Sequence, residues 1–261
     1  MIRELVRLRP DSTLGWLLRL PLALLPRDAV VRVRGGINQG AAWVVGASTH
    51  GCWLGSYEAD QQKFLAGVVK PGMRIWDVGA NAGFYTLAFA RLAGTSGRVH
   101  AFEPLAENVD HLLAHLRLNR IGNATVVQAA LGETEGESGF RVARSNSMGR
   151  LAPEATGYLV PTLTIDGFLA RHPESRPDLL KIDVEGAESR VLAGGLRCLR
   201  EFAPAIVLSL HGRAQFDACV ATLAGADYEL SRLDGAPLTP GDADCDQLYA
   251  VKRGLLASRR R

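Results

Sequence analysis

A glycine turn that follows an acid is the stretch of this chain whose residue types could do chemistry. In IWDVGANAGFYTLAFA, residues 75–90, an apolar run ends in Asp77, and Gly79, Asn81 and Gly83 follow at alternate positions. Glycine lets a backbone approach a ligand closely, and Asn tolerates the left-handed conformation better than most residues. A carboxylate before such a turn repels a phosphate but suits a ligand that carries a sulfonium or ammonium group.

A second acid stands about half a βαβ unit further along. Glu103 ends the run RVHAFEP and Pro104 follows it. An acid at this point can accept hydrogen bonds from both hydroxyls of an adenosine ribose. Asn81 occupies the position of the second glycine in the dinucleotide pattern G-x-G-x-x-G, which disfavours NAD. Both acids around the turn therefore indicate S-adenosylmethionine, and the alternative is that they are solvated acids at strand ends.

Two further acids follow in LLKIDVEGAE, residues 179–188. Asp183 and Glu185 are two residues apart on a predicted strand, where they would share one face. They could orient an acceptor, take a proton or bind a divalent ion through oxygen ligands. Lys181 lies in phase with them, so a structural row of ion pairs is the alternative. Glu188 is expected to cap a helix or to pair at the surface.

His211 ends the run LSLHG and is the candidate general base. The ordinary pKa of histidine, about 6.5, suits proton removal at neutral pH. A strand-end histidine that hydrogen-bonds to the backbone is the alternative. No metal site is predicted.

Short β-rich runs alternate with helix-length segments from residue 74 onward. We expect strands at 74–79, 97–104, 124–131, 178–186 and 204–211, and helices at 83–94, 106–120, 187–202 and 213–226. Apolar strands separated by amphipathic helices predict a parallel sheet, and the runs 228–233 and 247–253 would form a hairpin at its edge. Ligands bind beyond the carboxyl ends of the strands in such folds, where the turn and the acids fall.

The rest of the chain suggests three segments: a small N-terminal region over 1–56, the main domain over 57–254, and a basic tail over 255–261. Two short strands are expected around Gly35–Gly36, and residues 144–161 read as a long loop, a candidate lid. The leucine-rich segment 14–26 is expected to be a packed or accessory helix. A membrane-surface segment and a secretory signal are the less favoured alternatives.

Composition limits the function classes. The chain has 261 residues, 47% of them hydrophobic, and a net charge of +3, which is too small for a nucleic-acid footprint. The four cysteines are far apart, which disfavours a zinc or redox motif and suits free thiols in a reducing cytosol. We therefore expect a cytoplasmic protein that acts on a small molecule and not on nucleic acid.

The run from 68 to 104, together with KIDVEGAESRVLAGG at 181–195, resembles the FkbM family of S-adenosylmethionine-dependent methyltransferases. The similarity covers residues 50–212. It implies a class I methyltransferase fold, a Rossmann-like α/β fold with a seven-stranded, mostly parallel sheet and an antiparallel edge hairpin. Members of the family commonly methylate oxygen on sugars, polyketides, other secondary metabolites or cell-surface glycans.

The resemblance also implies a set of cofactor-binding residues. The turn supplies contacts to the methionine part of the cofactor, the acid after the second strand binds the ribose, the third strand end lies beside the adenine, and a Tyr-Glu pair closes over the site. These residues are Tyr57, Glu58, Asp77, Gly79, Ala80, Asn81, Gly83, Phe84, Tyr85, Thr86, Glu103, Pro104, Ala130 and Leu131. For Tyr57 and Glu58, an ordinary helix N-terminus with a surface acid remains the alternative.

These observations together predict an S-adenosylmethionine-dependent O-methyltransferase. Its acceptor would be a hydroxyl of a small metabolite or a glycosyl unit, and Asp183, Glu185 and His211 would be catalytic. Two alternatives stay open: a scaffold of the same fold that binds the cofactor without turnover, and, less favoured, an NAD-dependent oxidoreductase.

Overall fold

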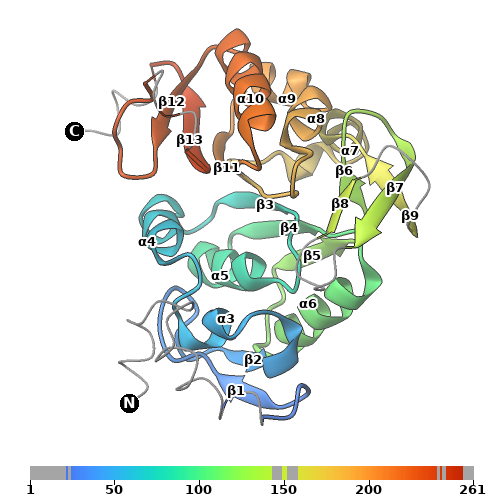
Figure 1. Ribbon diagram of the computed structural model, residues 1–261, viewed down its shortest axis with the longest axis vertical. Coiled ribbons are helices and arrows are strands. Elements are labelled where there is room, and N and C mark those ends of the chain that lie inside the picture. The colour runs from blue at the N-terminus through green and yellow to red at the C-terminus, as the bar shows by residue number, and fades with distance from the viewer. Residues whose placement is uncertain are drawn as a thin grey trace.

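A seven-stranded sheet forms the centre of the molecule (Figure 1). The computed structural model describes residues 22, 25–142, 149–151, 158–239, 242 and 245–254. The strands lie in the order β12 (Tyr228–Arg232), β13 (Gln247–Lys252), β11 (Ala205–Ser209), β10 (Leu179–Ile182), β3 (Arg74–Val78), β4 (Arg98–Phe102) and β5 (Ala124–Val127). The pairs from β11 to β5 are parallel, and β13 is antiparallel to both of its neighbours. The expected class I fold, with its edge hairpin, is confirmed.

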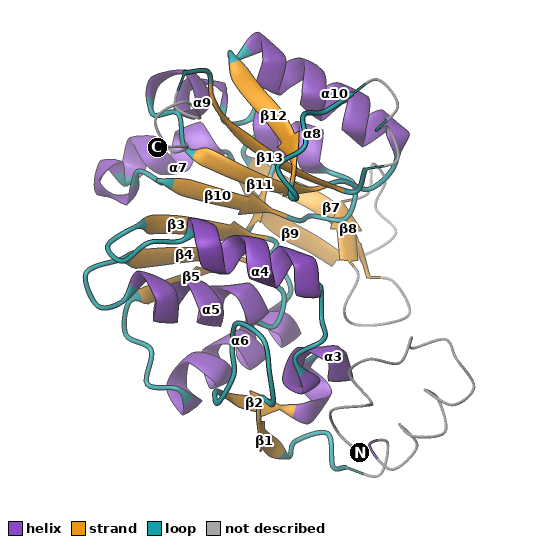
Figure 2. Ribbon diagram, turned by 90° about the vertical axis from the view of Figure 1, so that its left-hand side faces the viewer, coloured by secondary structure: helices purple, strands orange, loops and turns teal. Residues whose placement is uncertain are grey.

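Helices cover both faces of this sheet (Figure 2). One face carries α4 (Ala59–Val68), α5 (Phe84–Ala93) and α6 (Ala106–Leu118); the other carries α7 (Ile165–Arg171), α8 (Glu188–Ala193), α9 (Leu196–Glu201) and α10 (Arg213–Gly225). Alternate residues of β3 serve the two faces: Ile75 packs in the core on the α5 side, whereas Trp76 and Val78 pack in the core on the α7–α10 side. This two-sided burial is why the strands read as continuous apolar runs.

Gly194 and Gly195 interrupt the single helix expected at 187–202. The structure has two short helices there, α8 and α9. Gly194 lies so close to the carbonyl oxygen of Gly132 that a Cβ atom could not be accommodated. The approach of these two backbones therefore explains both the break and the use of glycine.

Residues 144–161 are not the single long loop that the sequence suggested. The described part of this region contains β8 (Gly149–Leu151) and the start of β9 (Tyr158–Leu163). With β6 (Ala130–Leu131) and β7 (Gly136–Val142), these strands form a four-stranded sheet in the order β6-β9-β7-β8. The run expected as one strand at 124–131 is thus divided between two sheets. The loop prediction was wrong because β8 has only three residues and β9 contains Pro161, and both features weaken the strand signal.

The described residues before α4 form what we call the N-terminal cap, residues 30–54. It contains the expected pair of strands, β1 (Val30–Arg32) and β2 (Ala42–Val44), followed by the 3-10 helix η2 (Val45–Ala47) and α3 (His50–Leu54). The cap is fastened to α6 by His115: its Nδ1 donates to the Ala82 carbonyl, and its Nε2 accepts from the Val44 N–H, 3.0 Å away. The indole of Trp43 stacks on the same imidazole at 3.8 Å.

The two ends of the chain lie largely outside the described residues. This applies to the segment 14–26, apart from residues 22, 25 and 26, and to the basic tail 255–261. Within the described ranges, no helix combines the length and the apolar character that crossing a bilayer requires.

Candidate active site

A cavity of about 340 Å³ lies beyond the carboxyl ends of β3, β4 and β10. Its volume falls in the range of small-molecule sites. Twelve of the predicted site residues line it: Tyr57, Gly79, Ala80, Asn81, Phe84, Tyr85, Glu103, Pro104, Ala130, Leu131, Asp183 and Glu185. The N-terminal cap adds Trp43 and Cys52 to the wall. The strand ends, the cap and the small sheet therefore enclose one common space.

The glycine turn has the backbone conformation that its sequence predicts. Gly79, Asn81 and Gly83 all have positive φ, at 80°, 50° and 86°. A Cβ on Gly79 would collide with the carbonyl oxygen of Asp183, so the turn and the end of β10 are in direct contact. Asn81 stabilises its own left-handed conformation, since its Oδ1 accepts from the Ala82 N–H at 2.7 Å. A side chain at Gly79 would therefore separate the two parts of the site.

Glu103 joins the second strand to this turn. Its Oε2 accepts from the Asn81 N–H at 2.8 Å, and its Oε1 accepts from the Leu105 N–H and the Asn108 amide. Burial raises the pKa of this carboxyl, and these three donors oppose the rise. An ionised carboxylate has about four acceptor positions. Because Oε2 has a single donor among the described residues and the side chain lines the cavity, Glu103 can still accept from a ribose hydroxyl.

Asp77 does not face the cavity, contrary to its predicted contact with the ligand. The side chain is fully buried, and its Oδ2 accepts from the Thr86 hydroxyl at 2.6 Å. Thr86 was expected to meet the methionine carboxylate, but its hydroxyl is directed to Asp77 instead. Burial raises the pKa of Asp77, and Lys181 opposes the rise. Both residues therefore support the turn from behind.

Tyr57 and Glu58 lie beside the turn, before α4. The ring of Tyr57 lines the cavity and packs edge-on against Phe84, with centroids 5.3 Å apart. The Glu58 carboxylate accepts a hydrogen bond from the Tyr85 hydroxyl at 2.7 Å. Glu58 and Gly83 are not among the described residues that form the cavity wall.

Lys181 is a charged residue of the cavity that sequence reasoning left without a ligand-binding role. It is 3% exposed, and its Nζ lies 3.2 Å from Asp183 Oδ2, 3.8 Å from Asp77 Oδ1 and 4.8 Å from the centre of the Tyr85 ring. The alternative of an ion-pair row on β10 is thus correct for Asp183, but the row continues to Asp77 and not to Glu185. These ion pairs connect β10 to its neighbour in the sheet, β3.

Asp183, Glu185 and His211 come together at one edge of the cavity; we call them the Asp-Glu-His cluster. His211 Nε2 lies 3.3 Å from Glu185 Oε2 and 3.9 Å from Asp183 Oδ1. The shared strand face expected for the two acids is not the reason, because β10 ends at Ile182 and Glu185 has a left-handed φ of 54°. The turn after the strand brings Glu185 back toward the cluster.

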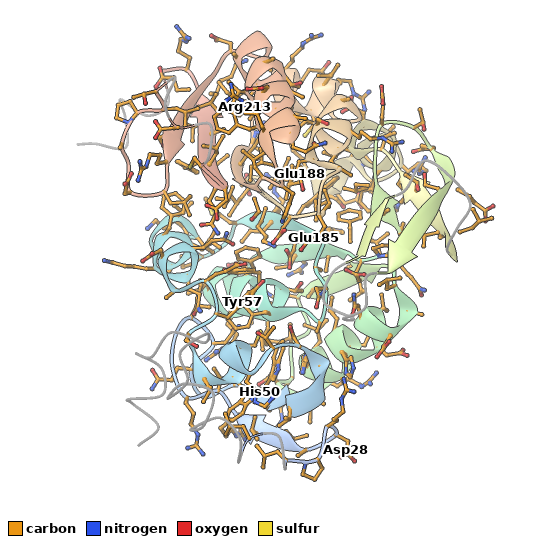
Figure 3. The ribbon with its side chains drawn as sticks, viewed as in Figure 1. Asp28, His50, Tyr57, Glu185, Glu188 and Arg213 are labelled. Carbon is orange, nitrogen blue, oxygen red and sulfur yellow. The ribbon has the colours of Figure 1, made fainter. Side chains whose placement is uncertain are left out.

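Glu188 is the functional candidate that the sequence prediction missed. It is fully buried, and its Oε1 lies 2.8 Å from His211 Nδ1 and 2.8 Å from the Gly186 N–H that donates to it. The expectation of a surface pair was therefore wrong. In Figure 3, Glu188 lies next to Glu185 near the middle of the molecule, with Tyr57 on the opposite side of Glu185. One signal could have indicated this contact. Glu188 follows β10 and His211 follows β11, and these two strands are neighbours in the sheet.

The surroundings of His211 change its acid–base behaviour. Its hydrogen bond to Glu188, together with the charges of Glu185 and Asp183, raises its pKa to about 9, although partial burial opposes the rise. The expected base at neutral pH would therefore already carry its proton in the ligand-free protein. The two carboxylates are the groups of the cluster that remain free to accept a hydrogen bond.

Comparison with known proteins gives one family match, to the FkbM methyltransferase domain, over residues 77–230. The hexuronic acid methyltransferase AglP of Haloferax volcanii is 27% identical over 127 residues, which cover 48% of this chain and 51% of AglP. The chain thus spans about half the length of that curated relative.

The chain also resembles many solved structures, among them two methyltransferases. One is a methyltransferase FkbM from Methylobacillus flagellatus, with 22% identity, a TM-score of 0.49, and coverage of 69% of this chain and 43% of that one. The other is an S-adenosylmethionine-dependent O-methyltransferase from Thermotoga maritima, with 17% identity, a TM-score of 0.46, and coverage of 73% and 63%. The fold assignment rests on the strand order of this chain itself.

Proposed function

This chain belongs to the FkbM methyltransferase family, and we propose from this that it transfers a methyl group from S-adenosylmethionine to a hydroxyl of a small metabolite or a glycosyl unit. The observation that carries the proposal is the common cavity. Its wall contains the glycine turn and Glu103, which suit the cofactor, as well as Asp183 and Glu185, which suit an acceptor.

Several described groups fit the cofactor. Glu103 accepts from the ribose, and Ala130 and Leu131 offer an apolar wall for the adenine. The backbone N–H groups at the start of α5, at Phe84 and Tyr85, suit the methionine carboxylate, because a helix N-terminus attracts anions. When bound, S-adenosylmethionine supplies a methyl group that its positive sulfur already activates.

The carboxylates of the Asp-Glu-His cluster orient the acceptor. One of the two carboxylates, Asp183 or Glu185, would accept a hydrogen bond from the hydroxyl and take its single proton while the new O–C bond forms and the C–S bond breaks. The sulfur keeps the electron pair of the broken bond. His211, held by Glu188, fixes the position of Glu185 through the 3.3 Å contact. Alignment of the two reacting atoms contributes a large part of the acceleration in such displacements.

A glycosyl acceptor is the more specific form of the proposal. It is supported by the similarity to a hexuronic acid methyltransferase, which extends over about half of each chain. We also propose a cytoplasmic location, which suits the four cysteines: each of them is free in the structure. That nucleic acid is not a substrate stays a prediction.

Methyl transfer tests the proposal directly. The purified protein is incubated with methyl-labelled S-adenosylmethionine and a panel of neutral, amino and acidic monosaccharides and their glycosides. We expect label in an O-methyl sugar and equivalent release of S-adenosylhomocysteine, and we expect the double variant Asp183→Asn/Glu185→Gln to lose both. Cell extract is the final member of the acceptor panel. If the protein binds the cofactor but transfers methyl to none of these acceptors, the scaffold alternative is favoured.

A further inference from the structure

We propose that Asp183, Glu185 and His211 bind a divalent metal ion beside the cavity. The three residues offer one ligand atom each, and these atoms all lie within 4.8 Å of one another. Two carboxylate oxygens and one imidazole nitrogen form the kind of mixed O/N donor set that first-row divalent ions accept.

The separations between the donor atoms suit a shared ion. Metal–ligand bonds to nitrogen and oxygen are about 2.0–2.3 Å long, so neighbouring donors around one ion lie roughly 3–4.5 Å apart. Here His211 Nε2 lies 3.3 Å from Glu185 Oε2 and 3.9 Å from Asp183 Oδ1. Little movement is therefore needed for all three atoms to reach the same ion.

The hydrogen bond behind the imidazole is an independent observation that points the same way. Histidines that bind metals almost always donate their second ring N–H to a carboxylate, a carbonyl or water, and this bond fixes the tautomer. The fully buried Glu188 occupies that position at 2.8 Å from Nδ1. It leaves Nε2 as the nitrogen that faces the two carboxylates, which is the orientation that a metal ligand requires.

Lys181 arranges Asp183 in a similar way. Its Nζ contacts Oδ2 of Asp183 at 3.2 Å, so Oδ1 is the oxygen directed toward His211. The immediate surroundings hold three carboxylates, those of Asp183, Glu185 and Glu188, against the single ammonium of Lys181 and one imidazole. A divalent cation would offset this excess of negative charge.

The location gives the ion a use that rests on the proposed function. Asp183 and Glu185 line the cavity, so an ion between them can take an acceptor oxygen as a further ligand. Such an ion stabilises the negative charge that the oxygen develops as its proton leaves. His211 then acts as a ligand, which agrees with its position behind the carboxylates and not at the cavity wall.

Binding of Mn²⁺ to the metal-free protein of residues 1–261 tests the inference without any reaction. Free Mn²⁺ is followed by electron paramagnetic resonance during a titration at fixed pH. We expect a single site in the unaltered protein. Glu185→Gln and His211→Asn should each weaken it by about tenfold or more, and Glu188→Gln should weaken it by roughly tenfold through His211.

A matched control separates the cluster from ordinary surface binding. His172 also lies beside a carboxylate, at 3.7 Å from Glu174, but both side chains are largely exposed. His172→Ala should leave Mn²⁺ affinity unchanged. Circular dichroism checks the fold of each variant, and Glu185→Gln is the safest one, because that side chain is 32% exposed. Absence of Mn²⁺ binding, or equal affinity in the unaltered and Glu185→Gln proteins, would overturn the inference.

The same samples distinguish this inference from the proposed function. S-adenosylmethionine is titrated into the protein in the presence of a chelator, and its affinity should not depend on the metal. Mn²⁺ binding without cofactor binding would leave the metal site standing and remove the methyltransferase proposal. Cofactor binding without Mn²⁺ binding would remove the metal site and leave the methyltransferase proposal standing.

Discussion

Glu188 and His211, 23 residues apart in the chain, are joined by a hydrogen bond of 2.8 Å between Oε1 and Nδ1. The glutamate belongs to the start of α8, and the histidine follows β11. The parallel pairing of β10 with β11 brings their carboxyl ends together, which is why these two segments meet. This bond decides which imidazole nitrogen faces Asp183 and Glu185.

Loss of His211 should affect catalysis and not the cofactor. His211→Ala is expected to lower turnover by at least about tenfold, because the acceptor-side carboxylates lose the group that positions them. The affinity for S-adenosylmethionine should stay the same, since His211 is not among the described residues of the cavity wall. Steady-state kinetics combined with calorimetry measures both. Unchanged turnover would exclude His211 from the reaction.

Asp77 should contribute to the stability of the fold through its buried contact with Lys181. Asp77→Ala leaves Lys181 with Asp183 as its remaining carboxylate within the buried row, and we expect a loss of about 3 kcal/mol in the free energy of unfolding. Urea unfolding measures it. The control is Asp217→Ala, which breaks the exposed pair with Arg213 and should cost less than about 1 kcal/mol. Equal effects of the two substitutions would contradict the buried network.

Gly79 should not tolerate a side chain. Gly79→Ala places a methyl group against the Asp183 carbonyl, whereas Gly40→Ala has the same positive φ, 81° against 80°, with open space around it. Gly40→Ala should therefore cost only the backbone strain of about 1–2 kcal/mol. Gly79→Ala should cost more and also weaken cofactor binding. Similar stability of the two variants would show that the turn does not need this contact.

His115 should make the fold sensitive to acid. Burial lowers its pKa from 6.5 to about 4; the hydrogen bond to the Ala82 carbonyl opposes this shift, and His111 adds to it. A pKa that is lower in the folded state contributes stability above pH 6.5, and this contribution is lost as the pH falls toward 4. The loss amounts to about 3 kcal/mol over that window.

The measurement for His115 is a series of urea titrations between pH 7 and pH 4. The unaltered protein is compared with His115→Gln, which keeps a donor and an acceptor but does not titrate. The variant should show a smaller loss of stability in this range. If the free energy of unfolding falls equally with pH in both proteins, protonation of His115 does not destabilise the folded state.

Much of the main sheet could be predicted from the sequence, because the residue pattern of each strand agrees with its position in the fold. The strands β3, β4, β10 and β11 are apolar on both faces, and left-handed residues mark the turn after β3. The small sheet could not be predicted, because β6 and β8 have only two and three residues and β9 carries a proline within its run. The meeting of Glu188 with His211 likewise depends on strand adjacency, which no local pattern encodes.

The sequence also could not show which of the acids at the strand ends is buried and which one faces the cavity. Asp77 and Glu103 look equivalent in the sequence, since each follows an apolar run, yet only Glu103 lines the cavity. The difference comes from Lys181 and Thr86, which draw the Asp77 carboxylate into the interior. Which acid a lysine on a neighbouring strand will pair with is a matter of sheet register, and register follows only from the folded structure.

The most direct test of the account is calorimetric titration of the protein with S-adenosylmethionine, S-adenosylhomocysteine and NAD in parallel, repeated with Glu103→Ala. We expect both sulfur compounds to bind and NAD not to bind, and we expect Glu103→Ala to lose binding while it keeps its fold by circular dichroism. Failure of folded protein to bind either sulfur compound, or undiminished binding by Glu103→Ala, would contradict it.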